Sequence, residues 1–133
     1  MKFFSEYFEN LDIKDEFKFP YLVGVYSKAI IDSSYFSEIS KKNTTFKKWL
    51  SNQQLISSNL MKIFNKANEF ERKLRLDSLR NSDLSELVTS NFKDNLNIRN
   101  SEVSFYFIRG FNDYRKFKEK YPTKQGENND SEA

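Results

Sequence analysis

Hydrophobic residues recur along the chain at the steps of three and four residues that are typical of amphipathic helices. The segment from Tyr21 to Ile31 is apolar on nearly every side, which predicts the most buried helix. A central strand is the competing interpretation, and the lack of other alternating segments argues against it. A short helix is also predicted near the start of the chain, with an apolar side formed by Phe3, Phe4, Tyr7, Phe8 and Leu11.

Asp32 to Thr45 contains many polar and turn-forming residues, so we expect a loop with a short turn of helix. Phe46, Trp49 and Leu50 then share one helical face, which would attach the residues around them to the core.

Two more helices are predicted in the second half of the chain. The first runs from Ser57 or Ser58 to about Leu76, and its basic outer side is partly balanced by Glu69 and Glu71. The second is expected to begin with a cap at Asn81 to Asp83 and to reach about Phe92.

The last predicted helix begins at Asn100 or Ser101 and ends near Tyr121, before Pro122. Its aromatic residues recur at steps of three or four, which favours a core stripe over a platform for stacking nucleic-acid bases. Gly110 costs about 1 kcal/mol relative to alanine inside a helix, so we expect another helix to approach closely there. The stripe consists of Val103, Tyr106, Phe107, Gly110, Phe111, Tyr114 and Phe117.

These segments predict an all-α protein, a compact bundle of about five helices. Residues 1–121 are expected to form a single domain, because 133 residues correspond to one domain rather than two. After Thr123 no apolar residue occurs before the final alanine, so residues 122–133 are expected to form a disordered acidic tail.

The composition removes most classes of enzyme. There is no histidine and no cysteine, which excludes thiol nucleophiles, disulfides, thiolate or imidazole metal sites and the commonest general base. The acids are scattered, and Gly24, Gly110 and Gly126 are too far apart for a phosphate-binding loop. We therefore expect a protein that is not an enzyme and holds no metal or cofactor.

No segment at the start resembles a secretion signal, because Ser5 and Glu6 interrupt the apolar residues. The longest strongly apolar run, Tyr21 to Tyr26, is far shorter than the roughly 20 residues that cross a bilayer. A cytoplasmic protein without membrane contact is the simplest expectation.

Charge is distributed unevenly along the chain. The net charge is +3, yet residues 1 to 19 and the tail after Lys124 are acidic, so that Tyr21 to Lys124 carries 19 cations and 11 anions. A basic body between acidic ends favours a polyanionic partner, and a solvated helical surface is the alternative. The candidate phosphate-contacting residues are Lys41, Lys42, Lys47, Lys48, Lys62, Lys66, Arg72, Lys73, Arg75, Arg109, Arg115, Lys116 and Lys120. Contacts of this kind bind a nucleic-acid backbone without reading its sequence.

The order of several segments resembles a known family. YLVGVYSKAII, TFKKWLSNQQL, SSNLMKIFNKANEFERKL and SEVSFYFIRGFNDYRKF are similar to the C-terminal helical domain of the large subunit of type I-B CRISPR Cascade complexes. The family's final helix has a cap, an aromatic triplet and a glycine, which correspond here to Ser101, Phe105, Tyr106, Phe107 and Gly110. Because the chain has no room for the large subunit's other domains, it looks like the separate small subunit that some systems translate from an internal start.

The resemblance implies a non-catalytic helical bundle in an RNA-guided antiviral surveillance complex. Its partners would be the Cascade large subunit, the backbone subunits, other copies of itself, the guide RNA, the target DNA and the displaced DNA strand. An architectural helical adaptor that binds only proteins is the main alternative. A stand-alone regulator is a weaker one, because no recognition helix with its preceding tight turn is evident.

Overall fold

In the computed structural model the chain is all-α, which confirms the expected fold class. The structure describes residues 8–35, 40–73, 79–92 and 98–120. A short 3-10 helix, η1 (Asp15–Phe17), leads into α2 (Lys18–Tyr35), which is followed by α3 (Ser40–Ser51), α4 (Ser57–Lys73), α5 (Leu79–Ser90) and α6 (Asn100–Lys120). None of the described helices is long and apolar enough to cross a membrane.

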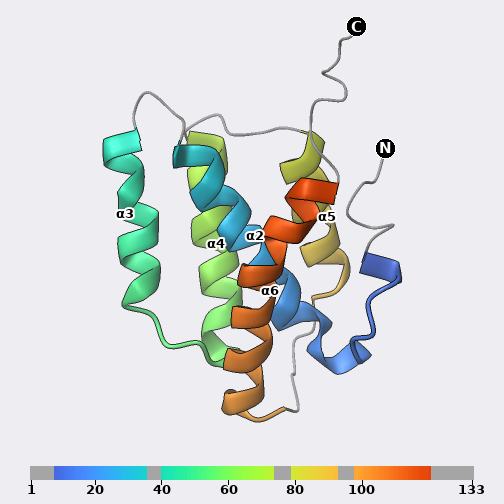
Figure 1. The fold of residues 1–133 in the computed structure, drawn as a ribbon. Helices are drawn as coiled ribbons and strands as arrows, with labels where there is room; N and C mark the ends of the chain where they lie inside the picture. Colours follow the sequence, from blue (N-terminus) through green and yellow to red (C-terminus); the bar gives the residue numbers. More distant parts are fainter. Residues whose placement is uncertain (1–7, 36–39, 74–78, 93–97, 121–133) are drawn as a thin grey trace, which may run out of the picture.

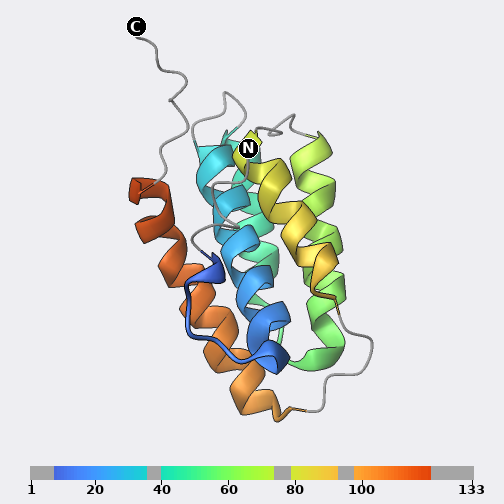
Figure 2. The same ribbon diagram turned by 90° about the vertical axis from the view of Figure 1, so that its right-hand side faces the viewer.

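α2 is the central helix of the bundle and packs against η1, α3, α4, α5 and α6. Figure 2 shows α6 on one side of α2 and α4 with α5 on the other. This position explains why α2 needs apolar residues around its whole circumference. Tyr21, Leu22, Val23, Val25, Tyr26, Ala29 and Ile30 are fully enclosed, which confirms the prediction of a buried helix and rules out the alternative of a strand.

α6 crosses α2 at two glycines (Figure 1). A Cβ atom on Gly24 would overlap the carbonyl group of Phe107, and one on Gly110 would overlap the carbonyl group of Tyr21. The backbones of the two helices therefore touch, which is the close approach expected from Gly110. The stripe beside it also faces the core: Val103, Phe107, Tyr114 and Phe117 are buried, and Tyr106 and Phe111 pack at its margin.

The loop expected over residues 32–45 is largely wrong. α2 continues to Tyr35, and α3 already begins at Ser40. Ion pairs support the polar end of α2. The Asp32 carboxylate lies 3.3 Å from Lys28 Nζ in the same helix and 3.6 Å from Lys118 Nζ on α6. The prediction for the second half of α3 is confirmed, since Phe46 and Leu50 are buried and Trp49 is half-buried.

The caps expected for the last two helices are also corrected. α5 already includes Leu79, and Asn81 and Asp83 are buried within it, where the Asn81 amide donates to Ser33 Oγ at 3.1 Å. At the start of α6, the Glu102 carboxylate accepts a hydrogen bond from the backbone N–H of Arg99 at 3.0 Å, as in a capping box.

Several expectations fall outside the described residues. They include the helical structure of residues 3–7, the last turn expected at Leu74–Leu76 and the disordered tail at 122–133. Phe8, within the described part of the first predicted helix, is helical and buried against the core.

Candidate nucleic-acid interface

One group of candidate cations lies on two neighbouring helices. Lys47 and Lys48 are exposed on α3, and Lys62 and Lys73 are exposed on α4, where Lys66 is half-buried. α3 packs against α4, so these five lysines, called here the α3–α4 basic surface, come from adjacent elements. Lys47, Lys48, Lys62 and Lys73 form no ion pair with any residue that the structure describes, which leaves their ammonium groups available to phosphates.

Trp49 and Lys66 join the two helices at the centre of this surface. The Lys66 ammonium lies 5.7 Å from the centre of the Trp49 ring and 3.7 Å from the carboxylate of Glu69. The Trp49 ring stacks on the ring of Phe46. The centre of the Phe46 ring lies 5.5 Å from the centre of the Phe70 ring of α4. These aromatic contacts fix α3 to α4 and so keep Lys47 and Lys48 beside the lysines of α4.

The acids of the described chain lie mostly elsewhere. α3 contains four lysines and no acid, whereas residues 8–17 contain one lysine and four exposed acids: Glu9, Asp12, Asp15 and Glu16. In Figure 1, α3 and α4 lie on the left of the bundle, and the segment from residue 8 to η1 lies with α5 on the right. The fold therefore gives the bundle a basic side and an acidic side.

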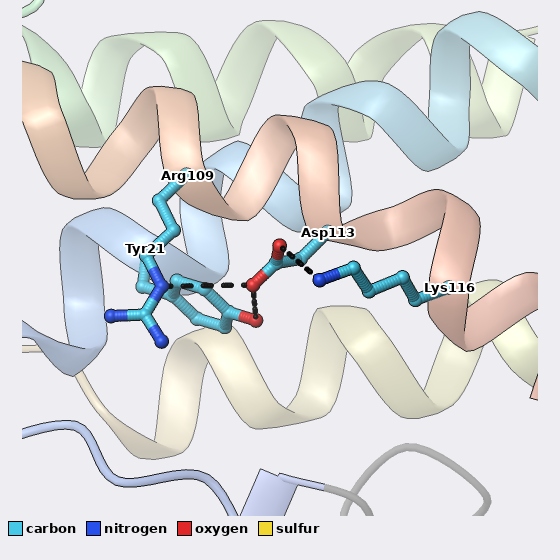
Figure 3. Close-up of polar contacts among 4 residues, drawn as sticks. All are labelled: Tyr21, Arg109, Asp113 and Lys116. Atoms are coloured by element: carbon cyan, nitrogen blue, oxygen red, sulfur yellow. Dashed lines mark hydrogen bonds and ion pairs between the residues drawn. The ribbon is translucent and has the colours of Figure 1, made fainter.

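The candidate cations of α6 are in a different environment. Asp113 accepts a hydrogen bond from the Tyr21 hydroxyl at 2.8 Å and lies 3.8 Å from Arg109 Nε and 3.9 Å from Lys116 Nζ (Figure 3). The Arg109 guanidinium also sits 5.9 Å from the centre of the Tyr21 ring. Part of the positive charge of Arg109 and Lys116 is thus already balanced by Asp113.

Arg115 is the exception on α6, because it is exposed and makes no ion pair with a described residue. α6 lies across α2 from α4, so Arg109, Arg115 and Lys116 form a second group that is separate from the α3–α4 basic surface (Figure 2). The side chains of four further candidates, Lys41, Lys42, Arg75 and Lys120, lie outside the part of the chain that the structure describes.

Arg72 belongs to neither group. It lines a cavity of about 420 Å³ together with Asn68 and Glu71 of α4 and Ser82 and Ser85 of α5. The Arg72 guanidinium donates a hydrogen bond to the Asn68 side-chain oxygen at 2.6 Å. Arg72 therefore borders a cavity between α4 and α5 and is not part of the α3–α4 basic surface.

Glu71 corrects the predicted surface of α4. It was expected on the outer side, yet it is only 6% exposed and accepts a hydrogen bond from the buried Tyr26 hydroxyl of α2. Burial raises the pKa of Tyr26 far above its usual range, and the hydrogen bond to Glu71 and the negative charge of Glu71 raise it further. Hydrogen bonds with Asn68 and Ser85 lower this pKa, but by less. Helical spacing places Glu71 one residue after Phe70 and four after Ala67, which was the available signal that it borders the core.

Comparisons with protein-family models, with curated proteins and with solved structures found no match to this chain. The function is therefore inferred from the surface chemistry of the helices and from the segments that resemble the C-terminal helical domain of the Cascade large subunit.

Proposed function

We propose that the chain is a non-catalytic helical subunit that binds the phosphate backbone of nucleic acid, and that it serves as the small subunit of a type I-B CRISPR Cascade complex. The observation that carries this proposal is the separation of charge across the bundle. The unpaired lysines of α3 and α4 lie on one side, and the four exposed acids of residues 8–17 lie on the other. A surface of this kind attracts a polyanion and orients it on one side.

The spacing of the lysines suits a nucleic-acid backbone better than a single small anion. Lys62 and Lys73 are eleven residues apart on α4, which corresponds to about 16 Å at the helical rise of 1.5 Å per residue. Several phosphates along a strand could be contacted over such a length without any contact to base edges. Within Cascade, the surface would support the guide RNA–target DNA duplex or the displaced strand, beside the large subunit, the backbone subunits and further copies of the chain.

Charge reversal on α3 tests the proposal. Lys47→Glu/Lys48→Glu should weaken binding of target DNA by the assembled complex and lower the dependence of log K on log salt by about 0.7–0.9 for each lost phosphate contact. Each single reversal, Lys47→Glu or Lys48→Glu, is compared with Lys14→Glu, which makes the same change of charge at an exposed lysine of the acidic side and should have little effect. Unchanged affinity of the double variant across several salt concentrations would count against this surface.

The alternative of an adaptor that binds only proteins is favoured by one observation on α6. Phe105 is 59% exposed and Ile108 is 48% exposed, one turn apart on the same helix. An apolar pair of this kind would suit a protein partner, and it is compatible with nucleic-acid binding on the α3–α4 basic surface.

A further inference from the structure

The cavity between α4 and α5 has the chemistry of a ligand site. Its volume of about 420 Å³ is within the range of roughly 300–1,000 Å³ that is usual for small-molecule pockets. Its lining combines a carboxylate, a guanidinium, an amide and two hydroxyl groups, from Glu71, Arg72, Asn68, Ser82 and Ser85. Arg72 and Ser82 are exposed at the cavity and Glu71 is buried, so a ligand could replace water as the hydrogen-bond partner of this lining.

Glu71 is the decisive residue of the cavity. Its Oε1 atom accepts the hydrogen bond from Tyr26, whereas Oε2 accepts none from the residues that the structure describes. The side chain is 6% exposed and yet lines the cavity, so a largely buried carboxylate borders it. An ionised carboxylate only accepts hydrogen bonds, and each of its oxygens has two lone pairs, so Oε1 can accept a second donor besides Tyr26 while Oε2 accepts another. The ligand should therefore present two adjacent donors.

Tyr26, which donates to Glu71, is itself held by Asn68. The Asn68 amide nitrogen donates to the Tyr26 oxygen at 3.1 Å, while the Asn68 oxygen accepts from Arg72 at 2.6 Å. A continuous chain of hydrogen bonds thus links Arg72, Asn68, Tyr26 and Glu71. Asn68 already makes two hydrogen bonds in this chain. The charged groups that remain to orient a ligand are the Glu71 carboxylate and the other N–H groups of Arg72, with the Ser82 and Ser85 hydroxyl groups beside them.

Arg72 decides the charge of the ligand. A guanidinium or ammonium group would satisfy Glu71, but it would be repelled by the guanidinium of Arg72 in the same cavity. A neutral ligand with two donors for Glu71 and a neighbouring acceptor for Arg72 avoids this repulsion and uses both groups.

We propose that this cavity binds the Watson–Crick edge of a guanine base. Guanine presents N1–H and the N2 amino group side by side, with the O6 acceptor next to them, which matches a carboxylate beside an arginine. Adenine, cytosine and uracil do not offer two adjacent donors on that edge. Base recognition here is separate from the backbone binding proposed for the α3–α4 basic surface.

Free nucleotides test the site without relying on that backbone binding. Calorimetric titration of the full chain with GMP, IMP, AMP, CMP and UMP should show binding of GMP that is about tenfold tighter or more than that of the others. IMP is the sharpest comparison, because it lacks only the amino group that would donate to Glu71. Equal affinity for GMP and IMP would overturn the proposed pairing.

Variants locate the binding. Glu71→Gln keeps an acceptor for Tyr26 but replaces the other oxygen with a donor, and it should weaken GMP binding by about tenfold or more. Glu69→Gln makes the same change of charge on an exposed side chain of the same helix and should leave GMP binding intact. Ser82→Leu, at an exposed position of the cavity, should block GMP without altering the melting temperature, which covers the case in which Glu71→Gln does not fold.

Two probes distinguish the sources of the base. If GMP binds with a preference over the other nucleotides but a guanine in an oligonucleotide adds no affinity, the ligand is a free nucleotide. If one guanine placed in a thymidine oligonucleotide increases its affinity and this increase requires Glu71, the ligand is a base within a strand. Either result supports the site. Binding of methylguanidine through Glu71 in the absence of GMP binding would overturn it in favour of a cationic partner. If no preference for guanine is found, the proposed function still stands as long as the chain binds a plain thymidine oligonucleotide in a salt-dependent way.

Discussion

Gly24 of α2 and Gly110 of α6 each lie against the backbone of the other's helix. An added Cβ atom would come within 2.9 Å of the carbonyl carbon of Phe107 in the first case and of Tyr21 in the second. Since the obstacle is main chain in both cases, neither helix can accommodate a methyl group by a change of rotamer. The contact sets the distance between the two helices that carry most of the core.

Gly24→Ala and Gly110→Ala should each lower the free energy of unfolding by about 1–3 kcal/mol, because the helices must separate. Intrinsic helix propensity acts in the opposite direction, because alanine stabilises a helix by about 1 kcal/mol relative to glycine. A decrease in the free energy of unfolding would therefore indicate a clash between the helices, and an increase would indicate free space. Urea denaturation measures it. Asn112→Ala, on the exposed side of α6, is the control and should be neutral or stabilising. Stabilisation by both glycine substitutions would mean that the helices do not touch here.

Periodicity was sufficient to predict the helices whose partners are apolar. The stripe of α6 and the enclosure of α2 follow from spacing alone, because each apolar residue there has a core to face. Gly110 even indicated the crossing, although its counterpart Gly24 did not stand out within an apolar run.

Polar residues with distant partners could not be predicted in the same way. α2 extends past Ile31 because Asp32 meets Lys118, far along the chain, and Asn81 is buried because it reaches Ser33. Glu71 has the character of a surface residue until Tyr26, forty-five positions earlier in the sequence, is placed beside it. The cavity at Glu71 was missed for this reason, although the prediction that Arg72 is exposed is confirmed.

The exposed pair Phe105 and Ile108 tests whether α6 docks onto a protein partner. Phe105→Ser/Ile108→Ser should leave the melting temperature nearly unchanged, since both side chains are largely solvated already. If the pair contacts a protein partner, the double variant should lose co-purification with the Cascade large and backbone subunits on co-expression, while the isolated chain keeps its salt-dependent nucleic-acid binding. Asn112→Ser provides a polar control on the exposed side of the same helix. Full retention of the partners would exclude this pair as a docking site.

Asp113 limits the contribution of α6 to nucleic-acid binding. Asp113→Asn keeps an acceptor for Tyr21 and removes the negative charge beside Arg109 and Lys116. We expect tighter binding at low salt and a steeper salt dependence, at a cost in stability of about 1–2 kcal/mol for the lost charge-assisted contacts.

Fluorescence anisotropy with a labelled oligonucleotide measures the effect of Asp113→Asn. Glu9→Gln, on the acidic side of the bundle, makes the same change in net charge and corrects for long-range attraction. An equal gain in the two variants would show that the cations of α6 do not contact the strand.

Tyr26 should make the stability of the bundle sensitive to high pH. Burial is the main reason that its folded-state pKa lies above the unfolded value of about 10, so the folded chain keeps a proton that the unfolded chain releases. The stabilisation is complete below about pH 10 and is lost above it, at about 1.4 kcal/mol per pH unit. Tyr26→Phe should lower the free energy of unfolding by about 1–3 kcal/mol at neutral pH, because Glu71 loses its hydrogen-bond donor. Between about pH 10 and 11 the free energy of unfolding of the variant, measured by urea denaturation, should fall less steeply than that of the wild type. Because the other tyrosines titrate in both proteins, the difference between the two slopes isolates Tyr26, and parallel slopes would contradict its retained proton.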